Sequence, residues 1–480
     1  MKIDSKVLGL AAFAVGAVFL FAVAERRPGY FADVTILGGT LMIEIIVVAI
    51  WHYERWFFPI LMFSFLWAGS SLPLATAGNA ARWIFLAVGA LVGVVRWGQN
   101  DRRQPFIAIH LVALLCVLAA AVSALVSHRG EMSLLKTTSL LALFLYEACG
   151  ARLALADREA VFFSGLITAC EVVTYLSAVC YLVVHFEVFG NPNALGAVMG
   201  IVVIPVLLWA VITTDDRHLR QRRAFALCVA SYLLYFSVSR AAIMGCAAAA
   251  IIMCIALHRQ HLLVKAAFIL VFLVAVVAVL QPARLDALVT AFTEDVIYKG
   301  KPQQGILGSR QSPWQETIAV IKESPWFGSG FGTDLAQYQQ ADAGGLEVAT
   351  PEGVVREHGN SYLAILQYVG LLGILPFVTL LAMILRQIGR GCSRMWRTHD
   401  ARSYTVPLVL IGIAGLIHAF FDDWLFAVGA YLNVFFWTAV FLLAQLQSGR
   451  SQDALVTPGW SGMPVPPRPV PLSTARSAGR

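Results

Sequence analysis

The chain has 480 residues, of which 59% are hydrophobic and only 13% are charged, and its mean hydropathy is +0.74. This composition excludes an ordinary water-soluble domain, because such a domain needs more polar residues to cover its surface. The net charge of +7 could suggest nucleic acid as a partner, but the basic residues form short clusters between apolar runs, which is typical of membrane topology. The sequence therefore predicts a polytopic membrane protein that does not bind nucleic acid.

The first apolar run, residues 7–24, follows two lysines and ends in Ala-Val-Ala, as a signal-peptidase site would. We prefer an uncleaved first helix, and cleavage is the alternative. Because a bilayer core takes about 20 apolar residues per helix, we count roughly 14 candidate spans. Their centres lie near residues 15, 41, 66, 90, 116, 144, 174, 204, 232, 249, 273, 373, 413 and 435. No run alternates like a barrel strand, so we expect an all-α fold.

Arginine clusters indicate the orientation, since basic loops stay in the cytoplasm. The clusters at 102–103, 217–223 and 386–402 fall on one side of the predicted membrane pattern. That side is predicted to be the cytoplasm, and both termini are predicted to lie there.

A polar island, residues 282–358, interrupts the apolar runs and is predicted to be a large extracytoplasmic loop. Within it, Ser312-Pro313 followed by Trp314 and spaced isoleucines predicts an N-capped amphipathic helix that ends at Ser324. The Gly-Ser-Gly-Phe-Gly series that follows indicates a tight turn. It is not a nucleotide-binding loop, because such a loop follows a β-strand and no strand is predicted here. The proline-rich segment 448–480 is predicted to be a disordered cytoplasmic tail.

Three residues on the predicted outer side could carry chemistry. Arg240 stands at a boundary between two apolar runs, Arg310 precedes the amphipathic helix, and His358 precedes the next span. Taken singly, each has an ordinary interpretation: an arginine that reaches lipid phosphate, a solvated loop arginine and a helix cap. Seven of the eight cysteines lie in apolar runs and suggest neither a disulfide framework nor a metal site.

Taken together, these segments resemble the O-antigen ligase and polymerase family. The resemblance is carried by Gly-Asn-Pro-Asn at 190–193, Ser-Val-Ser-Arg at 237–240, Arg310 ahead of Pro-Trp, Glu-Ser-Pro-Trp-Phe-Gly-Ser-Gly-Phe-Gly at 323–332, and His-Gly-Asn-Ser-Tyr-Leu at 358–363. The shared domain spans 186–437, preceded by transmembrane helices over 1–185 and followed by the end of the last helix at 438–447. The family histidine is often followed directly by asparagine, whereas Gly359 intervenes here.

The resemblance implies a glycosyltransferase of the bacterial inner membrane that moves a glycan from undecaprenyl pyrophosphate to an acceptor hydroxyl at the periplasmic face, in lipopolysaccharide or exopolysaccharide biosynthesis. It implies that Arg240, Arg310 and His358 are catalytic, and that no metal or other cofactor takes part. Guanidinium groups suit a leaving pyrophosphate, and an imidazole suits a proton acceptor near neutral pH. The chemistry is predicted to be an inverting displacement. Further predicted substrate contacts are Trp314, Arg356, Asn360, Asp422 and Asp423.

Several alternatives remain open. The acceptor could be lipid A core, another lipid-linked repeat or a protein hydroxyl, which correspond to a ligase, a polymerase and a protein O-oligosaccharyltransferase. Asp422-Asp423 could instead hold a divalent ion, form a helix corner, or pair with an arginine. A transporter or flippase for lipid-linked glycan is the competing class, but it would favour inverted repeats and ionisable residues at the midplane.

Overall fold

The computed structural model describes residues 54–71, 75–99, 106–151, 155, 159–281, 290, 293, 308–333 and 358–456. The predicted spans near residues 15 and 41, most of the polar island and the end of the chain lie outside these residues. So do the arginine cluster at 102–103 and the predicted contact Arg356.

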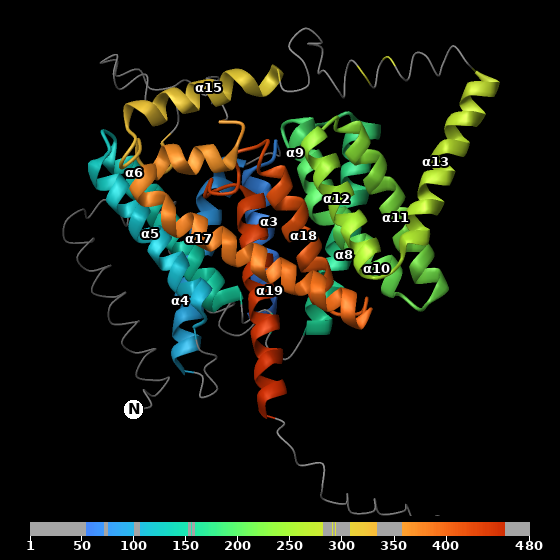
Figure 1. Cartoon of the computed structure of the whole chain (residues 1–480), viewed down its shortest axis with the longest axis horizontal. Helices are drawn as coiled ribbons and strands as arrows, with labels where there is room; N and C mark the ends of the chain where they lie inside the picture. The colour runs from blue at the N-terminus through green and yellow to red at the C-terminus, as the bar shows by residue number, and fades with distance from the viewer. Residues whose placement is uncertain are drawn as a thin grey trace, which may run out of the picture.

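Within the described residues the chain is α-helical, and no β-strand is present (Figure 1). The elements, in order, are α3 (Glu54–Ala68), α4 (Ala75–Gln99), α5 (Ala108–Val126), α6 (Gly130–Leu145), η2 (Tyr146–Gly150), α8 (Glu159–Ala178), η3 (Val179–Val184), α9 (Pro192–Ala197), η4 (Val198–Val203), α10 (Ile204–Thr213), α11 (Arg217–Phe236), α12 (Arg240–Ala256), α13 (Gln260–Leu280), α15 (Gly308–Glu323), α17 (Ser361–Thr398), α18 (Thr405–His418) and α19 (Tyr431–Val456), where η marks a π-helical stretch.

Seven helical stretches in the described part of the chain are long and apolar enough to cross a membrane, and three shorter apolar helices accompany them. The predicted all-α membrane architecture is therefore confirmed. Each predicted centre from residue 66 onward lies inside a described helix, while the full number of 14 spans stays a prediction. All eight cysteines are free.

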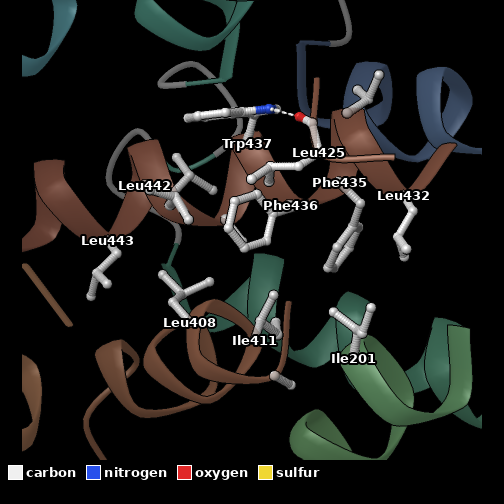
Figure 2. Packing of buried hydrophobic residues seen from close by; sticks show 14 of the residues in the cluster. Ile201, Leu408, Ile411, Leu425, Leu432, Phe435, Phe436, Trp437, Leu442 and Leu443 are labelled. Atoms are coloured by element: carbon white, nitrogen blue, oxygen red, sulfur yellow. Dashed lines mark hydrogen bonds between the residues drawn. The ribbon is translucent and has the colours of Figure 1, made fainter. Parts of the chain in front are cut away.

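The core of the bundle is formed by α18 and α19. Nearly every residue of α18 is buried, and Leu408 and Ile411 on α18 lie opposite the aromatic side chains of α19 (Figure 2). A helix that is apolar on all sides must be covered on all sides, by protein or by lipid. Near the start of α19, Trp437 donates its indole N–H to the carbonyl oxygen of Leu425 at 2.8 Å. The loop that joins the two helices, residues 419–430, is thereby attached to the core.

Helix α15 lies across one end of the bundle instead of running along it (Figure 1). It ends at Glu323, as predicted, but it begins at Gly308, four residues before the predicted start. The predicted N-cap is wrong, because the Ser312 hydroxyl donates to Oε1 of Glu316 at 2.7 Å and so does not bond the helix backbone. Pro313 is tolerated because it stands early in the helix, where it removes a single backbone hydrogen bond.

Helix α17 is broken at Gly370, which has φ 67° and ψ −175°. The turn after α15 fills the break: the amides of Ser329 and Gly330 donate to carbonyls on one side of it, and Leu371 and Leu372 donate to the carbonyls of Pro325 and Trp326. Backbone groups released by a break inside a membrane protein need such partners. The glycine series therefore forms a turn, as predicted, and it also holds together the two parts of α17.

The opposite end of the bundle collects the basic clusters at 217–223 and 386–402. Arg402 bonds both carboxylate oxygens of Asp215 at 2.8 Å, and the Trp209 indole donates to the carbonyl of Ala401. The segment just before α11 and the segment just after α17 therefore lie side by side. They lie at the far end of α17 from His358.

Candidate active site

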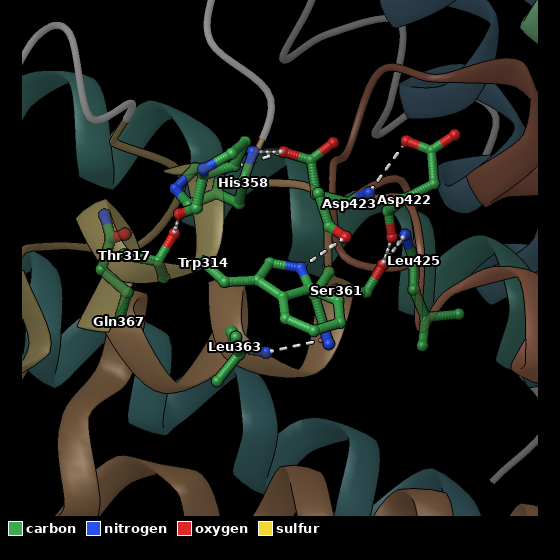
Figure 3. Close-up of polar contacts among 12 residues, drawn as sticks. Trp314, Thr317, His358, Ser361, Leu363, Gln367, Asp422, Asp423 and Leu425 are labelled. Carbon is green, nitrogen blue, oxygen red and sulfur yellow. Dashed lines mark hydrogen bonds and ion pairs between the residues drawn. The ribbon is translucent and has the colours of Figure 1, made fainter. Parts of the chain in front are cut away.

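At the α15 end of the bundle, His358 faces Asp423 (Figure 3). Oδ2 of Asp423 is 2.9 Å from the backbone nitrogen of His358 and 2.9 Å from Nδ1 of its ring. The His358 side chain is 1% exposed. Two contacts to one carboxylate oxygen fix both the backbone and the orientation of the ring.

The ionisation of Asp423 decides which ring nitrogen of His358 carries the proton. Burial acts to raise the pKa of Asp423, but hydrogen bonds from the His358 ring and backbone, together with the charge of the ring, outweigh it and leave the pKa below its usual range. An ionised carboxylate only accepts hydrogen bonds, so Nδ1 must donate. In a neutral ring the lone pair is then on Nε2, which is buried and has no hydrogen-bond partner in the described structure.

The start of α17 positions this pair. Asn360 is the N-cap, and its Oδ1 accepts the amides of Tyr362 at 2.8 Å and Leu363 at 3.2 Å. Ser361 connects α17 to the 419–430 loop, because its hydroxyl donates to the carbonyl of Asp422 at 2.7 Å and accepts the amide of Leu425 at 3.1 Å. The loop that carries Asp423 is thus fixed to the helix that follows His358.

Helix α15 covers the site and contacts the backbone next to His358. The Trp314 indole donates to the carbonyl oxygen of Gly359 at 3.0 Å. Gly359 has φ +66°, and a Cβ atom at this residue would stand 3.1 Å from Nη1 and 3.3 Å from Cδ of Arg310. The Arg310 side chain therefore lies against the backbone next to His358.

The second arginine comes from the start of α12. Ser239 is the N-cap of that helix and Arg240 is its first residue. Arg310 is close enough to Arg240 to repel it electrostatically, and it also acts on His418 at the end of α18. Like charges that are held together at a partly buried site favour the binding of an anion between or beside them.

The structure thus brings together Arg240, Arg310 and His358, the three residues predicted to be catalytic. They come from segments that lie far apart in the chain. Trp314 is also at the site. Asn360 is there as a helix cap, which accounts for its presence without a substrate contact. Asp423 pairs with a histidine, whereas an arginine was one of the partners expected for the Asp422-Asp423 pair.

Two residues of the site were missed from the sequence. His418 is the last residue of an apolar helix and carries no motif, although its spacing of four residues from Asp422 is a weak signal. Ser361 stands in the His-Gly-Asn-Ser-Tyr-Leu motif, but no role at the site was predicted for it. In the described residues no group of three or more side chains is arranged to hold a metal ion.

The family model described as O-antigen ligase matches residues 224–378. Over these residues the chain is similar to the O-antigen ligase family, as the resemblance of its motifs led us to expect. The match includes Arg240, Arg310 and His358 and lies inside the predicted domain 186–437, while Asp422 and Asp423 lie beyond it. No curated protein matches the chain significantly. The match supports a membrane enzyme of the O-antigen ligase or polymerase type.

Proposed function

We propose that the protein transfers a glycan from undecaprenyl pyrophosphate to the hydroxyl of an acceptor. The observation that carries the proposal is Nε2 of His358, a buried nitrogen whose ring is oriented by Asp423. The next residue, Gly359, lies against the Arg310 side chain. A histidine held by a carboxylate in this way is suited to accept a proton from a hydroxyl group.

The proposed reaction is one displacement at the anomeric carbon of the donor. The acceptor oxygen forms the new C–O bond while its proton passes to Nε2 of His358, and the bond to the pyrophosphate oxygen breaks. Attack opposite the leaving group inverts the anomeric configuration. The leaving pyrophosphate gains negative charge, which Arg240 and Arg310 stabilise with fixed guanidinium groups. Two arginines would thereby take the part that a divalent ion has in other glycosyltransferases.

The proposed orientation follows from the distribution of charge. The basic clusters at 217–223 and 386–402 lie together at one end, and clusters of basic residues at the ends of spans favour the cytoplasm. The site at the opposite end of α17 would then face the periplasm, where lipid-linked glycans are presented to their acceptors. The proposed location is the bacterial inner membrane.

The acceptor class sets apart three versions of this reaction: lipid A core for a ligase, a second lipid-linked repeat for a polymerase and a protein hydroxyl for a protein glycosyltransferase. The base and the two arginines serve each version equally. A transporter of lipid-linked glycan would have no use for an oriented base, so the His358 geometry favours the enzyme.

The test uses purified, reconstituted protein and lipid-linked glycan from the membranes of the native host. We expect His358→Ala and Arg310→Ala to abolish transfer, and His399→Gln and Arg402→Gln, matched changes at the far end of the bundle, to leave it intact. Retained turnover in both site variants would refute the assignment. If wild-type protein lengthens the glycan when only lipid-linked repeat is supplied, it is a polymerase; if transfer requires added lipid A core, it is a ligase.

A further inference from the structure

A helix from the N-terminal part of the chain contacts the loop that carries Asp423. Arg82 on α4 donates from Nη1 to the carbonyl oxygen of Gly429 at 2.6 Å. Its guanidinium carbon is 5.2 Å from the centre of the Trp83 ring and 6.0 Å from the centre of the Phe65 ring on α3. The Phe65 side chain is fully buried. Two aromatic rings therefore support the Arg82 guanidinium, and its N–H is directed at the end of the 419–430 loop.

The backbone of the loop lies directly on this arginine. Gly429 has φ +124°, a conformation that residues with a side chain rarely adopt. A Cβ atom there would stand 3.3 Å from Cζ2 of Trp83 and 3.8 Å from Cζ of Arg82. Glycine at this position thus allows the carbonyl to approach the guanidinium group closely.

Overlapping turns connect this contact to the carboxylate partner of the proposed base. The amide of Ala430 donates to the carbonyl of Ala427 at 3.2 Å, and the amide of Ala427 donates to the carbonyl of Trp424 at 3.1 Å. Trp424 follows Asp423 directly in the chain. Because one turn begins where the other ends, this part of the loop has little freedom to absorb a shift at Gly429. A displacement there should therefore reach the carboxylate of Asp423.

The same loop is attached to other helices as well. The Ser361 hydroxyl on α17 bonds the carbonyl of Asp422 and the amide of Leu425. The Trp437 indole on α19 bonds the carbonyl of Leu425. These bonds hold the first part of the loop, whereas Arg82 holds the part that leads into α19.

The ordinary interpretation of an arginine near the end of a span is a side chain that reaches lipid phosphate. Arg82 is the second residue of the candidate span Ala81–Gly98. It bonds a backbone carbonyl of the protein instead and lies against the Phe65 and Trp83 rings. Ionisable residues within spans are costly, and those that face the protein interior usually serve the function. The geometry therefore favours a role for Arg82 at the loop.

We infer that Arg82 is a positioning residue for the proposed base: it holds the 419–430 loop so that Asp423 orients the ring of His358. This inference rests on the proposed function. Arg82 lies before residues 224–378, which match the family model, and before the predicted domain 186–437. The catalytic geometry thus depends on α4, a helix outside the part of the chain that resembles the family.

The experiment measures single-turnover transfer in proteoliposomes over a range of donor concentrations. The variants are Arg82→Met, Gly429→Ala, Asp423→Asn and the double variant that combines Arg82→Met with Asp423→Asn. We expect the maximal rate of Arg82→Met and Gly429→Ala to fall about 10- to 100-fold, because a small displacement of a catalytic group has effects of this size. The donor concentration at half-maximal rate should stay the same, since Arg82 does not contact the donor. Arg402→Met, at the far end of the bundle, is the matched control and should transfer like the wild type.

The double variant decides the question, because a residue that acts through Asp423 has no effect once that carboxylate is replaced. Its maximal rate should equal that of Asp423→Asn within about threefold. A residue that only stabilises the fold would lower the rate by the same factor in both backgrounds. Equal factors, or a wild-type rate in folded Arg82→Met, would therefore overturn the inference.

A higher half-maximal donor concentration at an unchanged maximal rate would also overturn it, because this result indicates a direct contact with the donor. If Arg82→Met does not fold, Gly429→Ala takes its place in the double variant, since it shifts the carbonyl and leaves the arginine unchanged. Loss of transfer in His358→Ala would still support the proposed function in each of these cases. Absence of transfer by the wild-type protein would overturn both.

Discussion

Replacing Asp423 by asparagine tests the chemistry of the site directly. In the wild-type protein one carboxylate oxygen accepts both the backbone amide and the ring N–H of His358, each at 2.9 Å. Asparagine has nearly the same shape, but its amide group can turn its N–H toward Nδ1. His358 would then carry its proton on Nε2 and have no lone pair for the acceptor hydroxyl.

The size of the effect follows from the two bonds. Hydrogen bonds to a charged group are worth about 1.5–3 kcal/mol and neutral ones about 0.5–1.5 kcal/mol, so the orientation of His358 loses roughly 2–3 kcal/mol in total. Loss of a positioned general base lowers rates by about 10²–10⁴-fold, and a wrong histidine tautomer acts at the upper end of this range. We therefore expect kcat of Asp423→Asn to fall about 10²–10⁴-fold with little change in the KM of the donor.

The assay is single-turnover transfer from radiolabelled lipid-linked glycan in proteoliposomes, which measures the chemical step without product release. Asp215→Asn is the matched control, because Asp215 forms an exposed ion pair with Arg402 at the other end of the bundle. Its rate should equal that of the wild type. If folded Asp423→Asn kept kcat within about threefold of the wild type, His358 would not act as a base oriented by Asp423.

Three further predictions concern the same region. Gly359→Ala should lower kcat/KM, because a Cβ there would meet the Arg310 side chain at 3.1 Å in a left-handed backbone conformation, while Gly389→Ala, with open space around it, should be neutral in the same transfer assay. Gly370→Ala should lower the thermal unfolding midpoint. The φ of +67°, together with distances of 2.5 Å from the added Cβ to the backbone of the neighbouring turn, adds a strain of about 1–3 kcal/mol or more. An unchanged midpoint would contradict the described break in α17. The pKa of Asp423 in the folded protein lies below its unfolded value of 3.8. The ionised carboxylate therefore stabilises the fold fully above pH 3.8, and this stabilisation is lost as the pH falls through the folded pKa. The difference in melting temperature between wild type and Asp423→Asn should accordingly narrow below pH 3.8.

The helical membrane fold could be predicted because lipid leaves few choices. Long apolar runs without alternation must form helices, and the described helices occupy the predicted centres from residue 66 onward. The start of α15 was missed because a Ser-Pro pair is typical of a helix start, whereas here the Ser312 hydroxyl bonds a side chain one turn later. Local signals of this kind do not reveal how many residues precede them in the helix.

The candidate site was predictable where it depends on residue type and not where it depends on pairing. Arg240, Arg310 and His358 stand on the predicted outer side, and the resemblance of their motifs to the O-antigen ligase family selected them as catalytic. The partner of His358 was not predictable, since Asp422 and Asp423 are identical in type and adjacent. Only the turn after α18 decides which carboxylate reaches which imidazole, and it directs Asp423 toward His358 and Asp422 toward His418.

The glycine between His358 and Asn360, which departs from the usual family pattern, is explained by the same geometry. Its left-handed conformation lets Asn360 cap α17 while His358 turns back to Asp423, and the missing Cβ makes room for Arg310. The carbonyl of Gly359 also accepts the Trp314 indole, so the residue joins α15 to the start of α17. A histidine followed directly by asparagine would have to reach the same carboxylate without this additional residue. Gly359 therefore brings the proposed base, its carboxylate partner and the arginine to one place.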